Sequence, residues 1–262
     1  MYVFNISYTE ENMKKYVLEC CVDSVESAIE AEKGGADRIE LAANLIIGGT
    51  SPSMELYREI RKQTDIDIFV LLRPRFGDFN YTENEFKILK SEIAAFRDAG
   101  ADGVVIGCLK EDGTLDMERM KELVDEAGHM HVSLHRAFDM TRDPFELLEQ
   151  AKQLGIKTIL TSGHKNTAPE GKELIKELVE KAGDDIEILV GSGVNADVIR
   201  DFMKDTEATA FHLSGKVTLE SKMEYRKEGV NMGLPMMSEY EIIQTSADKI
   251  KQARDVIDAN RK

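Results

Sequence analysis

The stretch Val17–Asn44, VLECCVDSVESAIEAEKGGADRIELAAN, predicts a strand, a helix and a second strand. In its first part Leu18 and Cys20 alternate with Glu19 and Cys21, and a period of two is typical of a strand. A serine cap, an apolar stripe and a closing Gly-Gly pair then indicate a helix. A strand–helix–strand crossover of this length makes a parallel, right-handed pair.

The second strand of this unit, Asp37–Asn44, separates apolar from polar side chains. Ile39 and Leu41 fall on one face, and Glu40 falls on the other. In a parallel sheet covered by helices, the apolar set faces the helices. We therefore expect Glu19, Cys21 and Glu40 to point to the opposite side of the sheet.

The rest of the chain repeats this unit, and eight strand–helix units of about thirty residues predict a single-domain (β/α)8 barrel. An open doubly wound sheet is the alternative, but the first turn lacks its dinucleotide fingerprint. We expect an N-terminal extension at 1–16, a barrel over 17–262, a long loop at about 216–237 and a last helix near Glu239–Ala259. After the first two strands, the others are predicted at Asp67–Arg75, Gly103–Leu109, His131–Phe138, Thr158–Gly163, Glu187–Gly193 and Ala210–Gly215.

Composition limits the cellular compartments and the binding partners that we expect for this protein. The 262 residues carry a net charge of −15 and a pI near 4.9, which argues against nucleic acid or an anionic membrane as partner. We find no apolar run long enough for a membrane span and no signal-peptide pattern. The three cysteines form no even disulfide framework, so a reducing cytoplasm fits best. A homo-oligomer is an option that the sequence leaves open.

Ionisable residues gather at the carboxyl ends of the predicted strands, where barrels of this kind have their active sites. We expect seven side chains to face the barrel interior or its mouth. Asp139 follows the fifth strand and joins the candidate site. The seven are Glu19, Cys21, Glu40, Arg73, Arg75, His135 and His212.

Two interpretations of these charges stand about equal. Glu19, Glu40 and Arg73 are equally consistent with an internal ion-pair network that fills the lumen and with catalysis. A lone histidine is more often structural, but His135 shares its strand end with Asp139 and an arginine, which favours function.

The seventh and eighth predicted strands end in glycine-rich turns. Gly191-Ser192-Gly193 precedes a helix capped at Asn195, and Ser214-Gly215 ends the next strand. Backbone N–H groups beside a helix N-terminus bind anions, and this position in a barrel is a frequent phosphate site. The alternative is that the glycines only permit tight turns. Two such ends side by side favour an anion site.

Seven motifs in the same order resemble the CutC family, the copper homeostasis proteins. They cover nearly everything from Val17 to the last helix. The resemblance implies a (β/α)8 barrel, a cytoplasmic location and a role in handling Cu(I). The motifs are LECCVDS at 18–24, IELAANL at 39–45, LRPRFGDFNY at 72–81, LHRAFD at 134–139, ILTSG at 159–163, GSGV at 191–194 and FHLSG at 211–215.

One position departs from the family pattern, which has LEVCVDS and IELC in the first two strands with the two cysteines as suggested copper ligands. Here the first is kept as Cys21, but the second position is Ala42. Soft two-coordinate sites need paired sulfur ligands, so we expect Cys21 alone to bind Cu(I) weakly.

Two functional hypotheses follow. The first, implied by the resemblance, is a copper-handling protein. The second is a barrel enzyme that acts on a small phosphorylated or carboxylated metabolite. In it Arg73 and Arg75 would hold the anion, and Glu19, Glu40 or His135 would move a proton.

Overall fold

The computed structural model describes residues 15–234 and 237–261. Of the predicted extension at 1–16, only Lys15 and Tyr16 fall within this range. Tyr16 is already buried in the hydrophobic core.

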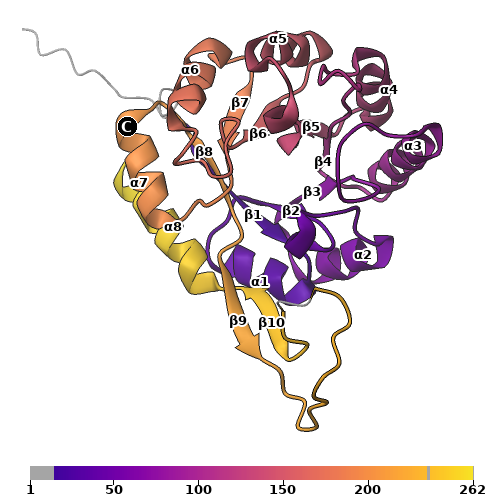
Figure 1. The fold of residues 1–262 in the computed structure, drawn as a ribbon. Helices are drawn as coiled ribbons and strands as arrows, with labels where there is room; N and C mark the ends of the chain where they lie inside the picture. The colour runs from indigo at the N-terminus through magenta and orange to yellow at the C-terminus, as the bar shows by residue number, and fades with distance from the viewer. Residues whose placement is uncertain (1–14, 235–236, 262) are drawn as a thin grey trace, which may run out of the picture.

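Eight parallel strands close into a barrel in the order of the sequence, and the last strand pairs with the first (Figure 1). This closure confirms the predicted single-domain (β/α)8 barrel and excludes the open sheet. The strands are β1 Val17–Val22, β2 Arg38–Leu41, β3 Asp67–Leu71, β4 Gly103–Ile106, β5 His131–Leu134, β6 Thr158–Thr161, β7 Glu187–Val190 and β8 Ala210–Leu213.

Helices form the outer ring of the barrel, and most begin at a polar residue whose side chain accepts from the first-turn amides. Ser24, Ser53 and Asp143 are caps of this kind. The helices are α1 Val25–Lys33, α2 Met54–Gln63, α3 Glu83–Asp98, α4 Met117–Ala127, α5 Pro144–Leu154, α6 Lys172–Ala182, α7 Ala196–Asp205 and α8 Ala247–Ala259, with 3-10 turns η2 Leu45–Ile47 and η3 Arg136–Met140.

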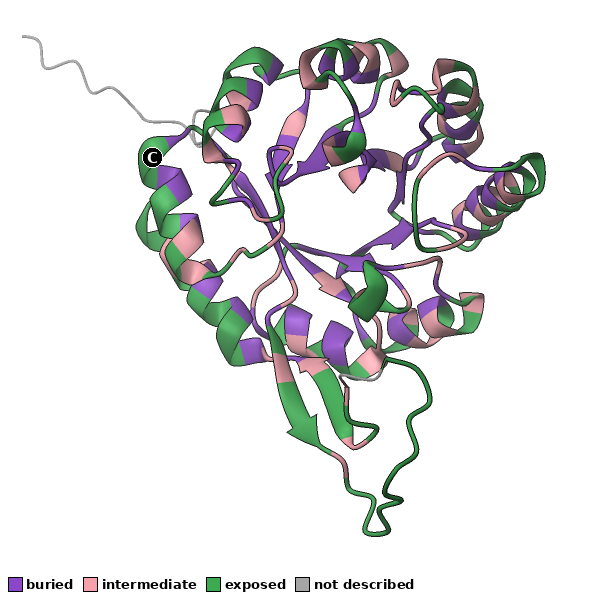
Figure 2. Ribbon diagram, viewed as in Figure 1, coloured by how far each residue is buried: buried purple, intermediate pink, exposed green. Residues whose placement is uncertain are grey.

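The two faces of each strand enter two different cores. Leu18 and Cys20 of β1 belong to the large outer cluster between the sheet and the helices. Val17, one residue earlier, packs in a separate cluster with Leu160, Leu189 and Ala210 from other strands. Alternation therefore separates the side chains as the sequence predicted. The barrel strands are almost entirely buried, and the helices bury only the face toward them (Figure 2).

The segment after β8 differs from the prediction. Strand β9, Lys216–Glu220, pairs antiparallel with β10, Glu241–Thr245, and the hairpin projects from the barrel (Figure 1). The predicted last helix was therefore too long at its start, because α8 begins only at Ala247. Buried side chains recur at helical spacing only from Ala247 to Ile257, so no buried helical face continues back to Glu239.

Candidate functional site

A cavity of about 820 Å³ lies at the carboxyl end of the barrel. Its position agrees with the rule that such barrels carry their sites in the loops after the strands. Of the predicted site residues, those that line it are Cys21, Glu40, Arg73, His135, Ser192, Gly193, His212, Ser214 and Gly215.

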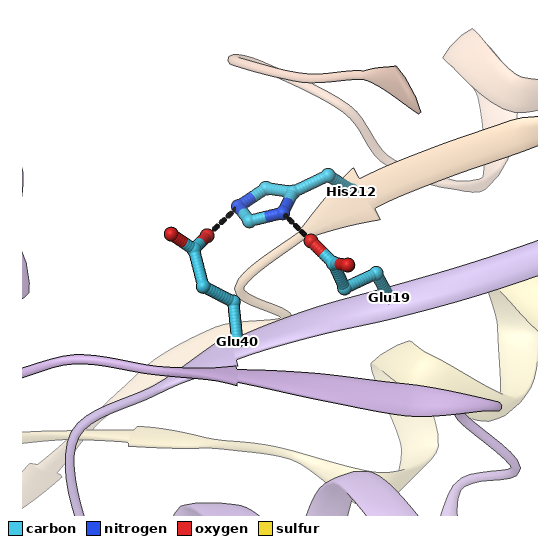
Figure 3. A group of neighbouring side chains, drawn as sticks. All are labelled: Glu19, Glu40 and His212. Carbon is cyan, nitrogen blue, oxygen red and sulfur yellow. Dashed lines mark hydrogen bonds and ion pairs between the residues drawn. The ribbon is translucent and has the colours of Figure 1, made fainter. Parts of the chain in front are cut away.

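Beneath the cavity a chain of charges, buried except at Glu187, crosses the lumen. Arg38 donates from Nε to Glu19 Oε2 at 2.5 Å and from Nη2 to Glu187 Oε1 at 2.7 Å. The other oxygen of Glu19, Oε1, lies 2.7 Å from Nδ1 of His212. His212 Nε2 in turn lies 3.4 Å from Oε2 of Glu40. The imidazole is therefore held between two carboxylates (Figure 3).

Strand register brings these groups together. Glu19 is opposite Arg38 on β2 and opposite His212 on β8, because β1 lies between those two strands. Glu40 is two residues beyond Arg38 and faces the same side. Residues far apart in the chain thus form one contiguous group by closure of the barrel.

Burial and charge set the protonation of this group. Burial alone would raise the pKa of Glu19, but Arg38 and His212 outweigh it and lower that pKa to about 2. Burial raises the pKa of Glu40 to about 7, against the opposing effect of His212. Burial alone would lower the pKa of His212, but Cys21, Glu19 and Glu40 raise it well above the usual range. His212 is therefore an imidazolium at neutral pH, and Glu40 exists in both forms.

The same three side chains have the spacing of metal ligands, with donor atoms within 4.8 Å of one another. In the protein without a metal, both ends of this group are engaged in other contacts. His212 would have to lose its proton before it could bind a metal. Glu19 already accepts a hydrogen bond from Arg38.

His135 is also buried at the cavity wall, but its tautomer gives it a different role. Nδ1 accepts a hydrogen bond of 3.1 Å from the amide of Ala137, so Nε2 carries the proton. Burial, together with the positive charge of Arg73, lowers the pKa of His135 to about 3. The ring is therefore a neutral N–H donor, which is poorly suited to the proton-accepting role considered from the sequence.

The two predicted anion-binding arginines separate. Arg73 lines the cavity, whereas Arg75 points toward α3 and is not part of the cavity wall. Arg75 Nε donates to Glu85 at 2.7 Å, and Nη2 donates to Asp78 at 3.0 Å. The expectation that Arg75 faces the mouth was wrong, because β3 ends at Leu71 and strand alternation no longer applies four residues later.

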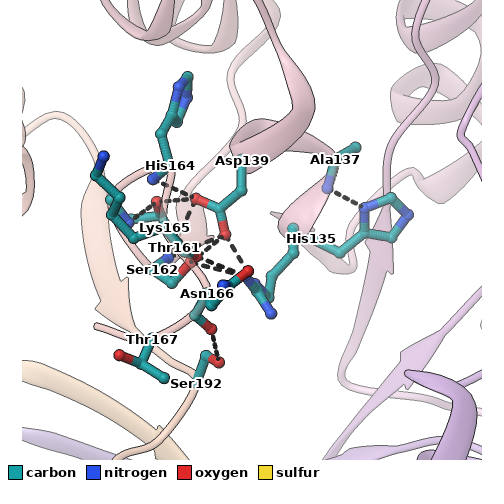
Figure 4. A network of polar contacts seen from close by, with 12 residues as sticks. His135, Ala137, Asp139, Thr161, Ser162, His164, Lys165, Asn166, Thr167 and Ser192 are labelled. Carbon is teal, nitrogen blue, oxygen red and sulfur yellow. Dashed lines mark hydrogen bonds and ion pairs between the residues drawn. The ribbon is translucent and has the colours of Figure 1, made fainter. Parts of the chain in front are cut away.

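Asp139 belongs to a polar network that shapes the turn between β6 and α6 (Figure 4). Its carboxylate accepts from the hydroxyl of Thr161 at 2.5 Å and from the amides of Ser162 and His164. Arg136 completes the network with a 2.7 Å ion pair. Asp139 does not reach the cavity wall, so it positions the turn.

The glycine-rich turns lie at the cavity as expected, except that Gly191 is not part of its wall. Ser192 and Gly193 both have left-handed backbone angles, which permit the tight turn before α7. Asn195 accepts from the amides of Asp197 and Val198, so two first-turn donors are already used. The Asp197 carboxylate also lines the cavity. The anion site at these turns stays a prediction.

The cysteines divide as alternation predicted. Cys21 lines the cavity, whereas the Cys20 thiol lies 3.9 Å from Thr245 on the helix side of β1. Ala42 is fully buried and packs against Leu71 and its neighbours in the lumen. The cavity wall therefore contains a single cysteine among the described residues.

Two members of the buried chain were absent from the predicted site residues. Arg38 shares its alternating set with Glu40, so its inward direction was readable from the sequence. Glu187 begins β7, and no local pattern shows that it meets Arg38 across the barrel. His212 was expected to face inward, but its pairing with two glutamates depends on the barrel register.

Barrel and site together define a (β/α)8 protein with a buried group of two carboxylates and an imidazole below its mouth. The sequence model of the CutC family matches residues 16–217, and this chain belongs to the CutC family. A human copper homeostasis protein cutC homolog is 41% identical over 237 residues, covering 90% of this chain and 87% of that protein. A CutC family protein of Parabacteroides distasonis is 44% identical over 239 residues, covering 90% and 98%.

Solved structures agree with the assignment. The CutC protein of Streptococcus agalactiae superposes with a TM-score of 0.73 at 30% identity and covers 76% of this chain and 98% of its own. Thiamine phosphate pyrophosphorylase from Pyrococcus furiosus superposes with a TM-score of 0.57 at 17% identity over 93% of this chain and 96% of its own, a likeness of fold alone. Within the described ranges, no helix combines the length and apolar character that a membrane span requires.

Proposed function

We propose that this protein is an enzyme that transfers a proton to or from a small anionic substrate, with Glu40 as the proton-transfer group. The observation that carries this proposal is the contact between Glu40 and His212 at the cavity wall, with both side chains buried. A catalytic acid or base works best when its pKa lies near the working pH. Burial gives Glu40 a pKa of about 7.

The buried charges next to Glu40 explain how its carboxylate stays ready to accept a proton. Glu19 remains ionised and holds the Nδ1–H of His212. The imidazolium thereby presents its Nε2–H to Glu40 and stabilises the carboxylate before a proton arrives. When Glu40 takes a proton from the substrate, the carboxyl becomes neutral, a state that burial favours. Arg38 keeps Glu19 charged throughout.

The charge around the cavity favours an anionic substrate. Four cations, Arg73, Arg136, Lys216 and Lys249, line it beside three carboxylates, Asp23, Glu40 and Asp197, so the lining is slightly positive although the whole chain carries a net charge of −15. Cations concentrated in a cleft raise the local concentration of anions. This local excess in an acidic protein supports a phosphorylated or carboxylated ligand.

The test is a two-stage experiment with the full-length protein. Thermal shift against phosphorylated and carboxylated metabolites first selects ligands, and each ligand is then incubated in D₂O and followed by ¹H NMR for exchange of a carbon-bound proton. Glu40→Gln should slow exchange by about 10²- to 10⁴-fold, the usual contribution of a general base. The control is Glu92→Gln, which removes another partly buried carboxyl that lies outside the cavity wall. Exchange that survives Glu40→Gln would overturn the proposal.

Copper handling is the second candidate function, favoured by the names of the relatives and by the place of Cys21 in the cavity. The donor set does not fit a paired-thiol site. Position 42 is alanine, and the thiol of Cys20 lies on the helix side of β1. His212 interacts with Cys21 and would have to lose its proton to bind Cu(I), and Glu40, opposite Cys21 on β2, offers a carboxylate, which is a poor ligand for Cu(I).

A further inference from the structure

Arg73 carries a buried positive charge that no carboxylate neutralises within the described residues. Its side chain is 8% exposed, and its nitrogens donate to the carbonyl oxygens of Gly48, Gly49 and Gly77. It forms no ion pair within 4.0 Å in the part of the chain that the structure describes. Burying a charge is costly unless a counter-charge accompanies it. Arg73 is thus prepared for an anion from outside the protein.

Unused donors show where that anion would bind. A guanidinium has five N–H donors, and the three carbonyl contacts leave two. One of them is Nε–H, which is buried and makes no hydrogen bond within the described residues, although the hydroxyl of Tyr81, itself without a hydrogen bond, lies close to the guanidinium. A bidentate contact with a carboxylate needs two such donors.

His135 supplies a second donor of the same kind. It is 4% exposed, and its Nε2 also lacks a partner within the described ranges. The ring of Phe79 lies between the two side chains, 4.9 Å from Cζ of Arg73 and 4.7 Å from the centroid of His135. All three residues line the cavity that Glu40 enters from β2. Since both nitrogens are buried beside Phe79, binding requires that ring to shift.

We propose that Arg73 and His135 form the substrate-anchoring subsite of this cavity and that it takes small 2-oxo acids. The guanidinium holds the carboxylate, and the Nε2–H of His135 donates to the adjacent oxo oxygen. The reaction at this subsite depends on the proposed proton-transfer function. The binding of the ligand depends only on Arg73 and His135.

The chemistry follows with atoms and charge in balance. A C–H bond next to the oxo carbon breaks, and its proton goes to the carboxylate of Glu40. The electron pair forms a carbon–carbon double bond, and the oxo oxygen takes the negative charge as an enolate. His135 stabilises that oxygen as a neutral donor, without giving up its proton. Donors aimed at developing charge in a buried site contribute strongly to such steps.

Binding is tested with pyruvate on the full-length protein labelled with ¹⁵N in arginine and histidine. Pyruvate should shift the Nε–H signal of Arg73 and the Nε2–H signal of His135 with one saturable midpoint. Pyruvamide, which has the oxo group but no charge, and inorganic phosphate should shift neither signal at the same concentrations. Equal binding of pyruvate and pyruvamide, or binding of phosphate alone, would overturn the assignment.

Matched variants sharpen the test. Arg73→Gln should weaken pyruvate at least about tenfold, as expected for loss of a charged hydrogen bond. Arg75→Gln removes a neighbouring arginine that does not line the cavity and should leave the affinity unchanged. Because Arg73 joins three loop carbonyls, its variant is checked for folding. His135→Phe is the second variant, and it should weaken pyruvate while keeping the ring packed against Phe79.

The outcomes separate the subsite from the function. Pyruvate that binds with the expected shifts but shows no exchange dependent on Glu40 would remove the proton-transfer function and keep the subsite. Exchange on a ligand without a carboxylate, with no pyruvate shift, would remove the subsite and keep the function. An equal loss of affinity in Arg75→Gln and Arg73→Gln would also contradict the subsite.

Discussion

Replacing Glu19 by Gln is expected to lower the free energy of unfolding by about 3–5 kcal/mol at pH 7, the usual cost of removing one partner of a buried ion pair. The variant leaves Arg38 and the protonated His212 in the lumen without the carboxylate that touches both. Two buried positive charges then face each other. Urea denaturation of the full-length protein measures the change.

The matched control is Glu187→Gln, because Glu187 is the other carboxylate that accepts from Arg38. The side chain of Glu187 is 24% exposed and that of Glu19 is 2% exposed, so water compensates for the first loss and not for the second. Glu187→Gln should therefore cost less than Glu19→Gln. If both variants lowered the free energy of unfolding by the same amount, burial would not determine how much these ion pairs contribute to stability.

The effect also has a defined pH dependence. The pKa of Glu19 in the folded protein is about 2, below the ordinary value of 4.5. A lowered carboxyl pKa contributes stability that is present above the unfolded value and is lost as the pH falls through the folded one. The difference between wild type and Glu19→Gln should therefore shrink between about pH 4.5 and pH 2.

Replacing Ala42 by Cys should raise the affinity for Cu(I) by about 10²- to 10⁴-fold, the gain typical of a second binding group held at the same site. Cys21 lies on β1, and Ala42 directly follows β2, the strand that is hydrogen-bonded to β1. Both side chains face the lumen. A second thiolate beside the first supplies the paired soft ligands that Cu(I) favours. Competition of the reduced protein against a Cu(I) chelator measures the affinity.

The control for this gain is Cys21→Ala in the Ala42→Cys background, which again leaves one thiol in the lumen. It should return the affinity to the weak wild-type level. Wild-type protein that already binds Cu(I) one-to-one as tightly as Ala42→Cys would contradict the account. Copper handling would then have to use Cys21 with other partners.

The faces of β1 and β2 were predictable because the side chains of a strand alternate and the helices cover one face of the sheet. That physics places Glu19, Cys21 and Glu40 on the lumen side, where the structure has Glu19 and Glu40 against His212 and Cys21 at the cavity wall. The barrel itself followed from the repetition of one strand–helix unit.

The rest depends on contacts that alternation does not describe. Beyond Leu71 the chain leaves the sheet, so the direction of Arg75 is set by Glu85 and Asp78 in the following segment. β10 depends on pairing with β9 and carries no helical spacing. The charge of His212 depends on its distances to two glutamates, which only closure of the barrel fixes.

The most direct test of the acid–base centre is an NMR titration of the wild-type protein, with ¹⁵N in histidine and ¹³C in the glutamate carboxyls. His212 should remain an imidazolium above the ordinary histidine pKa of 6.5, and Glu40 should titrate near 7. Glu40→Gln and His212→Gln assign the two signals. A His212 that loses its proton at its ordinary pKa, together with a Glu40 fully ionised at pH 5, would contradict the proposed centre.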